Sequence, residues 1–235
     1  MKKKSIGIIG AMECEITLLK VHLENIEEIN QGILTFYCGK IRGNNVILVK
    51  SGVGKVCASV CTQILIDKFN PDFIINTGIA GAIDNSLKIG DIVIGNKLVE
   101  HDFDVSALGY ARGYVCNGKN SKEPTYFYSD IKLIDEFKKS VDKSTTYTEG
   151  VIASGDIFIG DKLRKKELKD LFNAKAAEME GAAIAHAATL NDVPFLIIRG
   201  ISDLADENAA IEHDKVEQLV SDISSKTILT FLNTQ

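Results

Sequence analysis

The sequence predicts a single α/β domain, spanning residues 1–235, with a mixed, mostly parallel central sheet flanked by helices. Apolar, β-branched runs of strand length alternate with longer segments of helical period along the chain. This alternation is typical of a sheet that helices cover on both faces. The chain has 235 residues, of which 45% are hydrophobic, so it fits one large domain and can bury a substantial core.

Short apolar runs are expected to form the strands of this sheet, because they are rich in the β-branched residues that favour buried, pleated backbone. The expected strands are Ser5–Ile9, Ile33–Cys38, Val46–Val49, Phe73–Asn76, Asp91–Ile94, Thr148–Ala153 and Pro194–Arg199.

Longer segments of helical period separate these strands. The expected helices are Cys14–Glu24, Lys55–Phe69, Ile131–Val141, Lys162–Phe172, Glu180–Asn191 and Lys215–Leu232. In the second of them Val56, Val60 and Ile64 recur at helical spacing. The fifth is rich in alanine, the strongest helix former, and Asp161 can cap the helix that begins at Lys162.

The stretch Glu100–Pro124 follows neither pattern. It holds Gly109, Gly113 and Gly118 among residues of mixed polarity. We therefore expect an irregular excursion with a functional or interfacial role.

The charge balance argues against nucleic acid as a partner. Lysine and arginine number 27 against 32 aspartate and glutamate residues, for a formal net charge of −5, whereas backbone-phosphate binding needs a basic face.

The N-terminus and the cysteines indicate a cytoplasmic protein without a membrane anchor. The apolar run Ile6–Met12 is too short for a signal peptide and ends at Glu13, and no stretch approaches the ~20 apolar residues of a membrane span. The five cysteines are odd in number and include no CxxC pair, which favours free thiols in a reducing compartment.

Small residues and carboxylates follow nearly every expected strand. The segments are GAME (Gly10–Glu13), SGVGK (Ser51–Lys55), TGIAGA (Thr77–Ala82), SGDIFI (Ser154–Ile159), EMEGAA (Glu178–Ala183) and GISDLAD (Gly200–Asp206). Ligands of open α/β sheets bind beyond the carboxyl ends of the strands, and glycines allow close backbone approach. Together these segments predict a neutral-to-acidic pocket.

Three carboxylates are candidates for the chemistry of that pocket. Asp203 follows an apolar strand, where a solvated surface charge is not expected. Glu13 and Glu180 are weaker candidates, because an acid at a helix start is also electrostatically favourable for structural reasons. Phe158 follows SGD directly and either packs in the core or stacks on a flat ligand.

No cofactor or metal is expected. GIIGAM lacks the third glycine of a dinucleotide fingerprint, and SGVGKV has Val56 where a P-loop needs a hydroxyl residue to hold magnesium. His101, Asp102 and Asp104 have no partners at metal-ligand spacing elsewhere in the chain.

Taken in order and spacing, these motifs resemble those of the 5′-methylthioadenosine/S-adenosylhomocysteine nucleosidases, a family of the nucleoside phosphorylase superfamily. The segments that carry the resemblance are GIIGAMECE, SGVGKV, NTGIAGA, SGDIFI, AEMEGAAIAH and RGISDLAD. The resemblance runs from about Ser5 to about Leu232. It implies a nucleoside phosphorylase-like fold and hydrolysis of methylthioadenosine and S-adenosylhomocysteine to adenine and a thioribose, in methionine salvage and recycling of S-adenosylmethionine by-products.

The resemblance also implies roles for individual residues. Glu13 would position or activate the water, Asp203 would protonate, or hydrogen-bond to, N7 of adenine, and Glu180 would bind the ribose hydroxyls. The other residues implied in substrate binding are Met12, Ile79, Ala80, Gly81, Phe158, Ile159, Glu178, Met179, Arg199 and Ser202. Among these, Phe158 would stack on adenine and Met179 would pack beneath the sugar.

Two positions depart from the family pattern. Ile79 stands where many relatives carry serine, so its side chain cannot help to hold the water. His213 stands near the position of an aromatic residue that closes over the nucleoside. It can serve as a lid, lie at the surface or alter the nucleoside preference.

Family members are typically homodimers, so the resemblance implies a homodimer here. Residues of the segment Val105–Val115 would then reach the partner's site, with Val105, Leu108 and Val115 forming an apolar wall for the thioalkyl group.

Two rival functions remain. A phosphate-dependent purine nucleoside phosphorylase would need cations for phosphate, but of the four arginines only Arg199 lies near the motifs, and Glu13 would repel phosphate. A non-catalytic nucleoside sensor would have no need of Glu13.

Overall fold

The computed structural model describes residues 4–115, 121–143 and 145–235. Its strands are β1 (Ser5–Gly10), β2 (Glu24–Gln31), β3 (Leu34–Ile41), β4 (Asn44–Lys50), β5 (Phe73–Ala82), β6 (Ile92–Glu100), β7 (Phe127–Tyr128), β8 (Tyr147–Ser154), β9 (Ala174–Glu178) and β10 (Phe195–Asp203). Its helices are α1 (Glu13–Val21), α2 (Lys55–Phe69), α3 (Ile131–Ser140), α4 (Lys162–Phe172), α5 (Gly181–Leu190) and α6 (Ala209–Leu232), with a short 3₁₀ turn at Ser106–Leu108.

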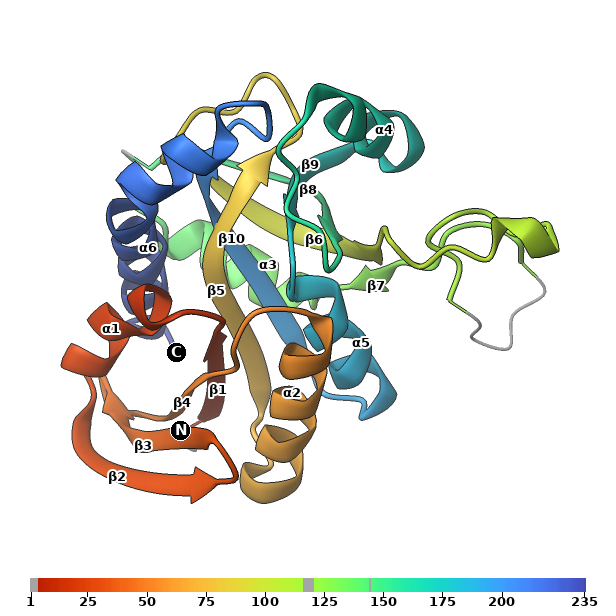
Figure 1. The fold of residues 1–235 in the computed structure, drawn as a ribbon. Helices are drawn as coiled ribbons and strands as arrows, with labels where there is room; N and C mark the ends of the chain where they lie inside the picture. The colour runs from red at the N-terminus through yellow and green to blue at the C-terminus, as the bar shows by residue number, and fades with distance from the viewer. Residues whose placement is uncertain (1–3, 116–120, 144) are drawn as a thin grey trace.

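The strands form one mixed sheet, as the sequence predicts (Figure 1). Parallel pairing joins β4, β1, β5 and β10 in its centre, and also β6, β8 and β9. Antiparallel contacts of β10 with β6 and of β5 with β9 close these strands into a ring. The ring brings the carboxyl ends of β5, β9 and β10 together, which is where the small-residue segments begin.

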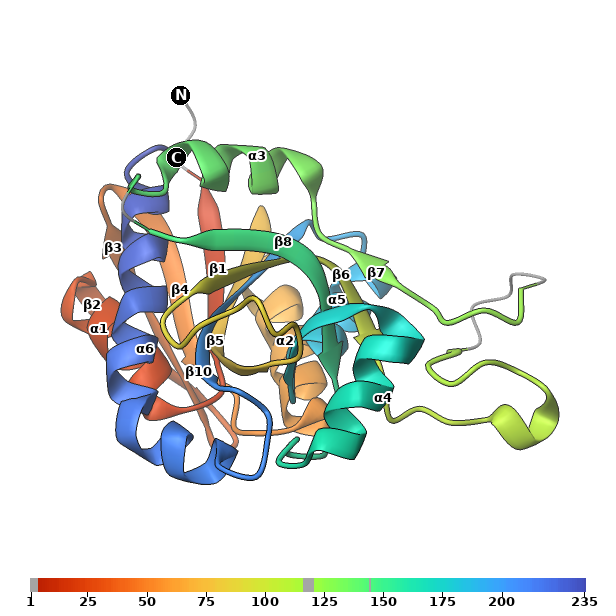
Figure 2. The ribbon, with the colours of Figure 1, turned by 90° about the horizontal axis from the view of Figure 1, so that it is seen from above.

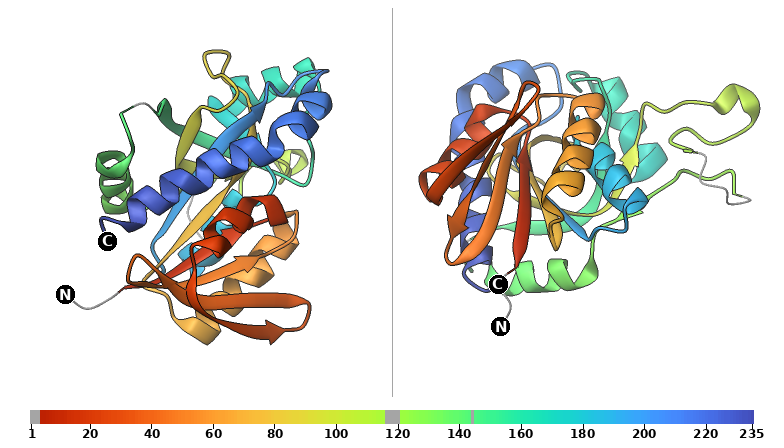
Figure 3. Two further views of the ribbon diagram at one scale, coloured as in Figure 1. Left: turned by 90° about the vertical axis from the view of Figure 1, so that its left-hand side faces the viewer. Right: turned by 90° about the horizontal axis from the view of Figure 1, so that it is seen from below.

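Helices cover both faces of the sheet, α1, α3 and α6 on one side and α2 and α5 on the other (Figures 1 and 3). Successive strand residues point to opposite faces, so Ile74 packs in the core beneath α2 and α5, and Ile75 packs beneath α1 and α6. Long parallel strands buried on both sides explain why the strand segments are almost continuously apolar.

The expected strands and helices are all present, but several boundaries differ. The first helix ends at Val21, because Glu24 already begins β2. The last helix begins at Ala209, upstream of the expected start at Lys215. Strands β5 and β10 continue to Ala82 and Asp203, so TGIAGA and the segment before Asp203 are strand rather than loop.

Two strands other than the minimal β7 were not predicted, because their sequences do not look like strands. The segment ENIEEINQ forms β2 at the sheet edge, where nearly every side chain is exposed and no apolar period is required. The segment AKAAE forms β9, although alanine, lysine and glutamate favour helix. Tertiary pairing with β8 and β5 overrides that local preference.

The stretch between β6 and β7 is the predicted irregular excursion. Its described residues, 101–115 and 121–126, project from the body of the molecule (Figures 1 and 2) and include the turn Ser106–Leu108. Leu108 is 73% exposed and Phe103 is 37% exposed. Gly118, which contributed to the prediction, lies outside the described residues.

Cys14, Cys38, Cys57 and Cys61 are free thiols, as expected, and Cys116 lies outside the described residues. Within the part of the chain that the structure describes, no helix is both long enough and apolar enough to cross a bilayer.

Close packing of β1 against α2 yields a test of the fold. A Cβ at Gly7 would lie 2.6 Å from Leu65 Cδ2, so Gly7→Ala is expected to destabilise the protein by about 1–3 kcal/mol. Leu65→Ala should cost about 2–5 kcal/mol. Leu65→Ala also removes the atoms with which a Cβ at Gly7 would clash. The double variant should therefore lose less free energy of unfolding than the sum of the two single variants. Urea denaturation of the four proteins measures these values, and additive losses would contradict the contact.

Candidate active site

A cavity of about 250 Å³ opens at the carboxyl ends of the central strands. It is lined by Ala11, Met12, Glu15, Val53, Ile79, Ala80, Gly81, Phe158, Ala177, Glu178, Met179, Glu180, Ser202, Asp203 and His213. Every one of the small-residue segments that follow the strands contributes to this wall. The predicted convergence of distant segments in a single pocket is thus present in the structure.

A second, smaller cavity of about 30 Å³ adjoins the first and shares Gly81, Phe158 and Asp203 with it. Ile159 lines this smaller space and is buried. Residues 155–161 connect β8 to α4 and are called the Phe158 loop below. The two cavities together form a wide compartment and a narrow extension, which lies between the Phe158 loop and the end of β10.

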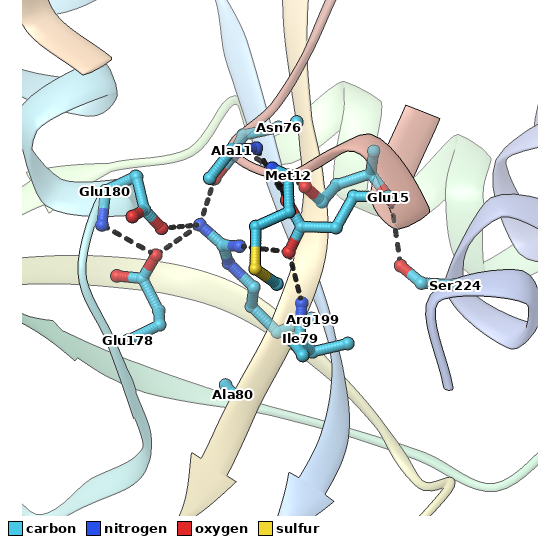
Figure 4. A network of polar contacts seen from close by, with 12 residues as sticks. Ala11, Met12, Glu15, Asn76, Ile79, Ala80, Glu178, Glu180, Arg199 and Ser224 are labelled. Carbon is cyan, nitrogen blue, oxygen red and sulfur yellow. Dashed lines mark hydrogen bonds and ion pairs between the residues drawn. The ribbon is translucent and has the colours of Figure 1, made fainter. Parts of the chain in front are cut away.

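The side chain of Arg199, from β10, is fully buried and lies among the cavity-lining acids Glu15, Glu178 and Glu180 (Figure 4). Its Nη2 donates to Asn76 Oδ1 at 2.6 Å and to a Glu178 carboxylate oxygen, and lies 3.4 Å from Glu180 Oε2. Its Nη1 is 3.8 Å from Glu15 Oε1. Three carboxylates therefore surround one cation.

Glu15 is held by backbone donors on the floor of the cavity. Its Oε2 accepts from Ala11 N at 2.5 Å and from Met12 N at 3.0 Å, and its Oε1 accepts from Ile79 N at 3.0 Å. Burial raises the pKa of Glu15 above its ordinary value, while Arg199 and the three N–H groups act in the opposite direction. The carboxylate is fixed in one orientation and is 2% exposed.

Glu13, the expected water-activating residue, does not reach the cavity. Its side chain is 58% exposed and pairs with Lys50 at 2.9 Å. Glu13 and Glu15 are two residues apart on α1, which places them about 200° apart around the helix axis. When Glu15 faces the cavity, Glu13 must face solvent.

The helix period alone does not separate the two acids. Ile16 and Leu19 form the buried face of α1, and Glu15 and Glu13 flank that face on opposite sides, about 70° and 90° from its centre. The sequence feature that favours Glu15 is its place as the third residue of the helix, from where an acid can reach back to the N–H group of the N-cap residue Met12.

Glu180 lies at the start of α5 and is 4% exposed. Its Oε1 accepts from the backbone N–H of Gly54 at 2.9 Å. Burial, with the negative charges of Glu178 and Glu15, raises the pKa of Glu180 to about 7, against the opposing effect of Arg199.

Glu178 serves the architecture of the site. Its Oε2 accepts from the backbone N–H groups of Glu180 at 3.1 Å and Gly181 at 2.7 Å, and thereby caps α5. Its Oε1 accepts from Ser154 Oγ. Because both oxygens are already engaged, Glu178 holds the β9–α5 turn that presents Met179 and Glu180.

Asp203 ends β10 and is 2% exposed. Its Oδ2 accepts from Ser202 Oγ at 2.8 Å, and its Oδ1 accepts from Ala205 N at 2.9 Å. A Cβ at Gly81 would lie 2.7 Å from Asp203 Oδ1, so a side chain at this position would displace the carboxyl group of Asp203.

Apolar side chains form the rest of the wall. Met12 and Met179 line the main cavity, and Phe158, which is 47% exposed, stands at its rim. His213 of α6 meets Phe158 edge to face, with ring centroids 6.0 Å apart. The sequence left open whether His213 covers the site, lies at the surface or alters the nucleoside preference. The structure places it at the cavity, next to Phe158.

Asp102 and Asp104, the acids of the EHDFD segment, have hydrogen-bond partners within the protein. Asp102 accepts from Lys55 Nζ at 2.7 Å and from Asp156 N at 2.8 Å. In the described ranges, histidine, cysteine and acidic residues form no group of three or more with metal-binding geometry.

The family assignment rests on comparisons as well as on this geometry. Residues 5–233 match the model of the phosphorylase superfamily. A 5′-methylthioadenosine/S-adenosylhomocysteine nucleosidase from Staphylococcus saprophyticus is 41% identical over 231 residues, covering 97% of this chain and 99% of that protein.

Solved structures agree. The nucleosidase of the same name from Neisseria meningitidis, in complex with methylthio-immucillin-A, has a TM-score of 0.93 at 38% identity, over 99% of this chain and 100% of that one. A futalosine hydrolase from Helicobacter pylori has a TM-score of 0.92 at 32% identity, over 99% and 98%.

Fold, cavity and matched residues define a member of the phosphorylase superfamily. Within it, the chain belongs to the family of 5′-methylthioadenosine/S-adenosylhomocysteine nucleosidases, which confirms the resemblance found in its sequence.

The raised pKa of Glu180 predicts how stability depends on pH. Glu180 ionises near 4.5 in the unfolded chain and near 7 in the folded protein. Between these values the folded state binds more protons, so the contribution of Glu180 to stability falls as the pH rises from 4.5 through 7. Glu180→Gln cannot ionise, so it should exceed the wild type in stability at pH 8 by on the order of 2 kcal/mol.

Thermal unfolding of both proteins at pH 4.5 and pH 8 measures this difference. At pH 4.5 the two should differ little, because Glu180 is largely neutral in the folded wild type. A variant that is less stable than the wild type at pH 8, with no such deficit at pH 4.5, would contradict the assignment.

Proposed function

We propose that this protein hydrolyses the N-glycosidic bond of 5′-methylthioadenosine and S-adenosylhomocysteine and releases adenine and a 5-thioribose product. The reaction belongs to methionine salvage and to the recycling of S-adenosylmethionine by-products. The observation that carries the proposal is the convergence of Glu15, Glu180 and Asp203, three buried acids from distant segments, on one cavity.

The charge distribution suits the bond that breaks. Cleavage of an N-glycosidic bond builds positive charge on the sugar and negative charge on the leaving purine, and enzymes stabilise such charges with preorganised groups. The carboxylates of Glu15 and Glu180 stabilise the positive charge on the sugar. A proton from Asp203 to N7 neutralises the negative charge on the purine, so that adenine leaves as a neutral base.

We assign water activation to Glu15 in place of Glu13. Its three backbone donors fix the carboxylate, and Arg199 Nη1, which has no hydrogen-bond partner among the described residues, faces it at 3.8 Å. Water held by Glu15 and Arg199 attacks C1′ of the sugar as the bond to the purine breaks. Glu15 takes the proton that this water loses.

The remaining residues bind the nucleoside. Glu180 accepts hydrogen bonds from the ribose hydroxyls, with Met12 and Met179 packed against the sugar. Phe158 stacks on the purine, and the backbone of Ile159 lies where it can read the base edge in the narrow extension.

Residues at the ends of β5 and β10 complete the site. Ala80 and Gly81 form a wall of small side chains, and Ser202 orients Asp203. Ile79 contributes its backbone N–H to Glu15, so the departure from serine leaves that contact intact.

Phosphorolysis fits this geometry poorly. Arg199 already faces the carboxylates of Glu15, Glu178 and Glu180. A phosphate dianion at the attack position would meet Glu15 rather than a free cation, so water is the better nucleophile for this site.

Substitution of the acids tests the mechanism. In phosphate-free buffer the wild type should release adenine from methylthioadenosine. Glu15→Gln should lower kcat by about 10²–10⁴-fold because the general base is lost, and Asp203→Asn should abolish adenine release. Glu13→Gln is the matched control two residues away and should retain activity.

Adenine release is followed by chromatography, and binding of a substrate analogue shows that the variants still fold. Strict dependence on phosphate would establish phosphorolysis instead. An active Glu15→Gln variant would remove Glu15 from the mechanism. Futalosine and 5′-deoxyadenosine in parallel assays define the substrate range.

A cytoplasmic homodimer is the second part of the proposal. Free thiols at the described cysteines fit a reducing compartment. Val56 and Val60 lie one helical turn apart on α2 and are 73% and 52% exposed, and Leu108 of the projecting segment is exposed as well. Neighbouring apolar residues at the surface, such as Val56 and Val60, are typical of an interface. We propose that a second copy covers them, and that Val105, Leu108 and Val115 extend the partner's cavity at its thioalkyl end.

Complementation between two variants tests this arrangement. Light scattering should give twice the 25.6 kDa chain mass. Leu108→Asp and Asp203→Asn should each have low activity as homodimers. In a refolded mixture, a heterodimer carries one site with an intact Asp203 and an intact Leu108 from its neighbour, so activity should return to about a quarter of the wild type. A fully active monomer, or a mixture no better than its components, would contradict the proposal.

A further inference from the structure

The turn between β4 and α2 donates two consecutive backbone N–H groups to the two halves of the site. Gly54 N donates to Glu180 Oε1 at 2.9 Å, and Lys55 N donates to Asp156 Oδ1 at 2.8 Å. Glu180 belongs to the sugar end of the cavity, and Asp156 lies two residues before Phe158, which stands at the purine end. One short turn therefore contacts both ends.

Asp102, two residues beyond the end of β6, links this turn to the Phe158 loop a second time. Its Oδ1 accepts from Lys55 Nζ at 2.7 Å, and its Oδ2 accepts from the backbone N–H of Asp156 at 2.8 Å. Lys55 Nζ also donates to Glu100 Oε2 at 3.0 Å. The side chains of Lys55 and Asp102 are only 17% and 16% exposed.

These contacts keep both partners charged. Burial alone would lower the pKa of Lys55, but its hydrogen bonds to Asp102 and Glu100 raise that pKa above its ordinary value. Burial would likewise raise the pKa of Asp102, but Lys55 and the Asp156 N–H lower it. Hydrogen bonds between charged groups of this kind are shorter and stronger than neutral ones.

Two glycines allow the close approach of the three segments. Gly54 has φ +98°, and a Cβ there would lie 3.0 Å from Asp156 Oδ1. A Cβ at Gly155 would lie 2.4 Å from His101 Nε2 and 2.9 Å from Asp102 Cγ. The β4–α2 turn, Asp102 and the Phe158 loop are therefore closely packed against one another.

We propose that Asp102, Lys55 and Asp156 form a brace that couples the purine half of the site to the ribose half, with Asp102 as its central positioning residue. A ligand in the purine half orders the Phe158 loop. The hydrogen bonds of the brace then restrain the β4–α2 turn, and Gly54 in that turn restrains Glu180. The inference rests on the proposed nucleosidase function. It also gives a role to Lys55 of SGVGK and to Asp102 of EHDFD, neither of which lines the cavity.

Asp84 offers a matched control for Asp102. Its side chain is also 16% exposed, and it accepts from Lys169 and Lys175 at 2.9 and 2.8 Å. Asp84 contacts neither the Phe158 loop nor the β4–α2 turn in any described hydrogen bond. Loss of its charge should affect stability alone.

Calorimetry with the two products tests the coupling without turnover. The affinity of the wild type for adenine is measured alone and with saturating 5-methylthioribose, and we expect each product to tighten the other about tenfold. Asp102→Asn keeps one acceptor oxygen where two are needed, so the coupling should fall below twofold. Asp84→Asn should retain it. Independent binding in the wild type, or full coupling in Asp102→Asn, would overturn the proposal.

Kinetics and a second pair of variants separate positioning from folding. Asp102→Asn should raise KM for methylthioadenosine about tenfold with a change in kcat of less than threefold, since ground-state binding is what it weakens. Asp156→Ala should lose the coupling, and Asp156→Asn, which keeps an acceptor for Lys55 N, should restore it. Equal behaviour of the two Asp156 variants would count against the brace. Absence of adenine release by the wild type would instead refute the nucleosidase function.

Discussion

The buried guanidinium of Arg199 is the interaction on which the rest of the site depends. It is fully buried, and ionised groups are costly to bury unless they are paired and hydrogen-bonded. Arg199 comes from β10, whereas the carboxylates of Glu15 and Glu180 come from α1 and the start of α5. Each segment can place its charge at the floor of the cavity only because the others are there. Gly78 makes room for the pair, since a Cβ there would lie 2.0 Å from Arg199 Nη1 and 2.4 Å from Glu15 Oε1.

The arrangement carries more acidic than basic groups, and the proposed function explains this imbalance. Three carboxylates around one guanidinium hold an excess that burial makes expensive, which is why the pKa values of Glu15 and Glu180 are raised. In the proposed reaction, a sugar that develops positive charge during bond cleavage would be the cationic partner of these carboxylates, and their mutual repulsion would then be relieved most in the transition state. The same excess of carboxylates disfavours an incoming phosphate, in agreement with the proposed hydrolysis.

Most of the fold follows from local patterns in the sequence, and the exceptions have a common cause. The strands that run beneath helices on both faces must be apolar throughout, so their sequences identify them. Strand β2 lies exposed at an edge and β9 is built from small helix-forming residues, so neither carries a local signal. Their strand conformation comes from the backbone donors and acceptors of β3, β8 and β5 alongside them.

The sequence by itself determined the class of fold, the segments that meet at the strand ends, and the family. Order and spacing of short motifs carry that information because each motif combines small residues with an acid directly after a strand. Only the tertiary structure decided which acid of GAMECE enters the cavity. Glu13 and Glu15 are chemically alike and two residues apart, and the rotation of α1 against the sheet, set by the burial of Ile16 and Leu19, turns Glu15 inward. The tertiary structure likewise decided that Lys55, Asp102 and Asp156 meet, because residues 47 and 54 positions apart become neighbours only when separate strands end at the same edge.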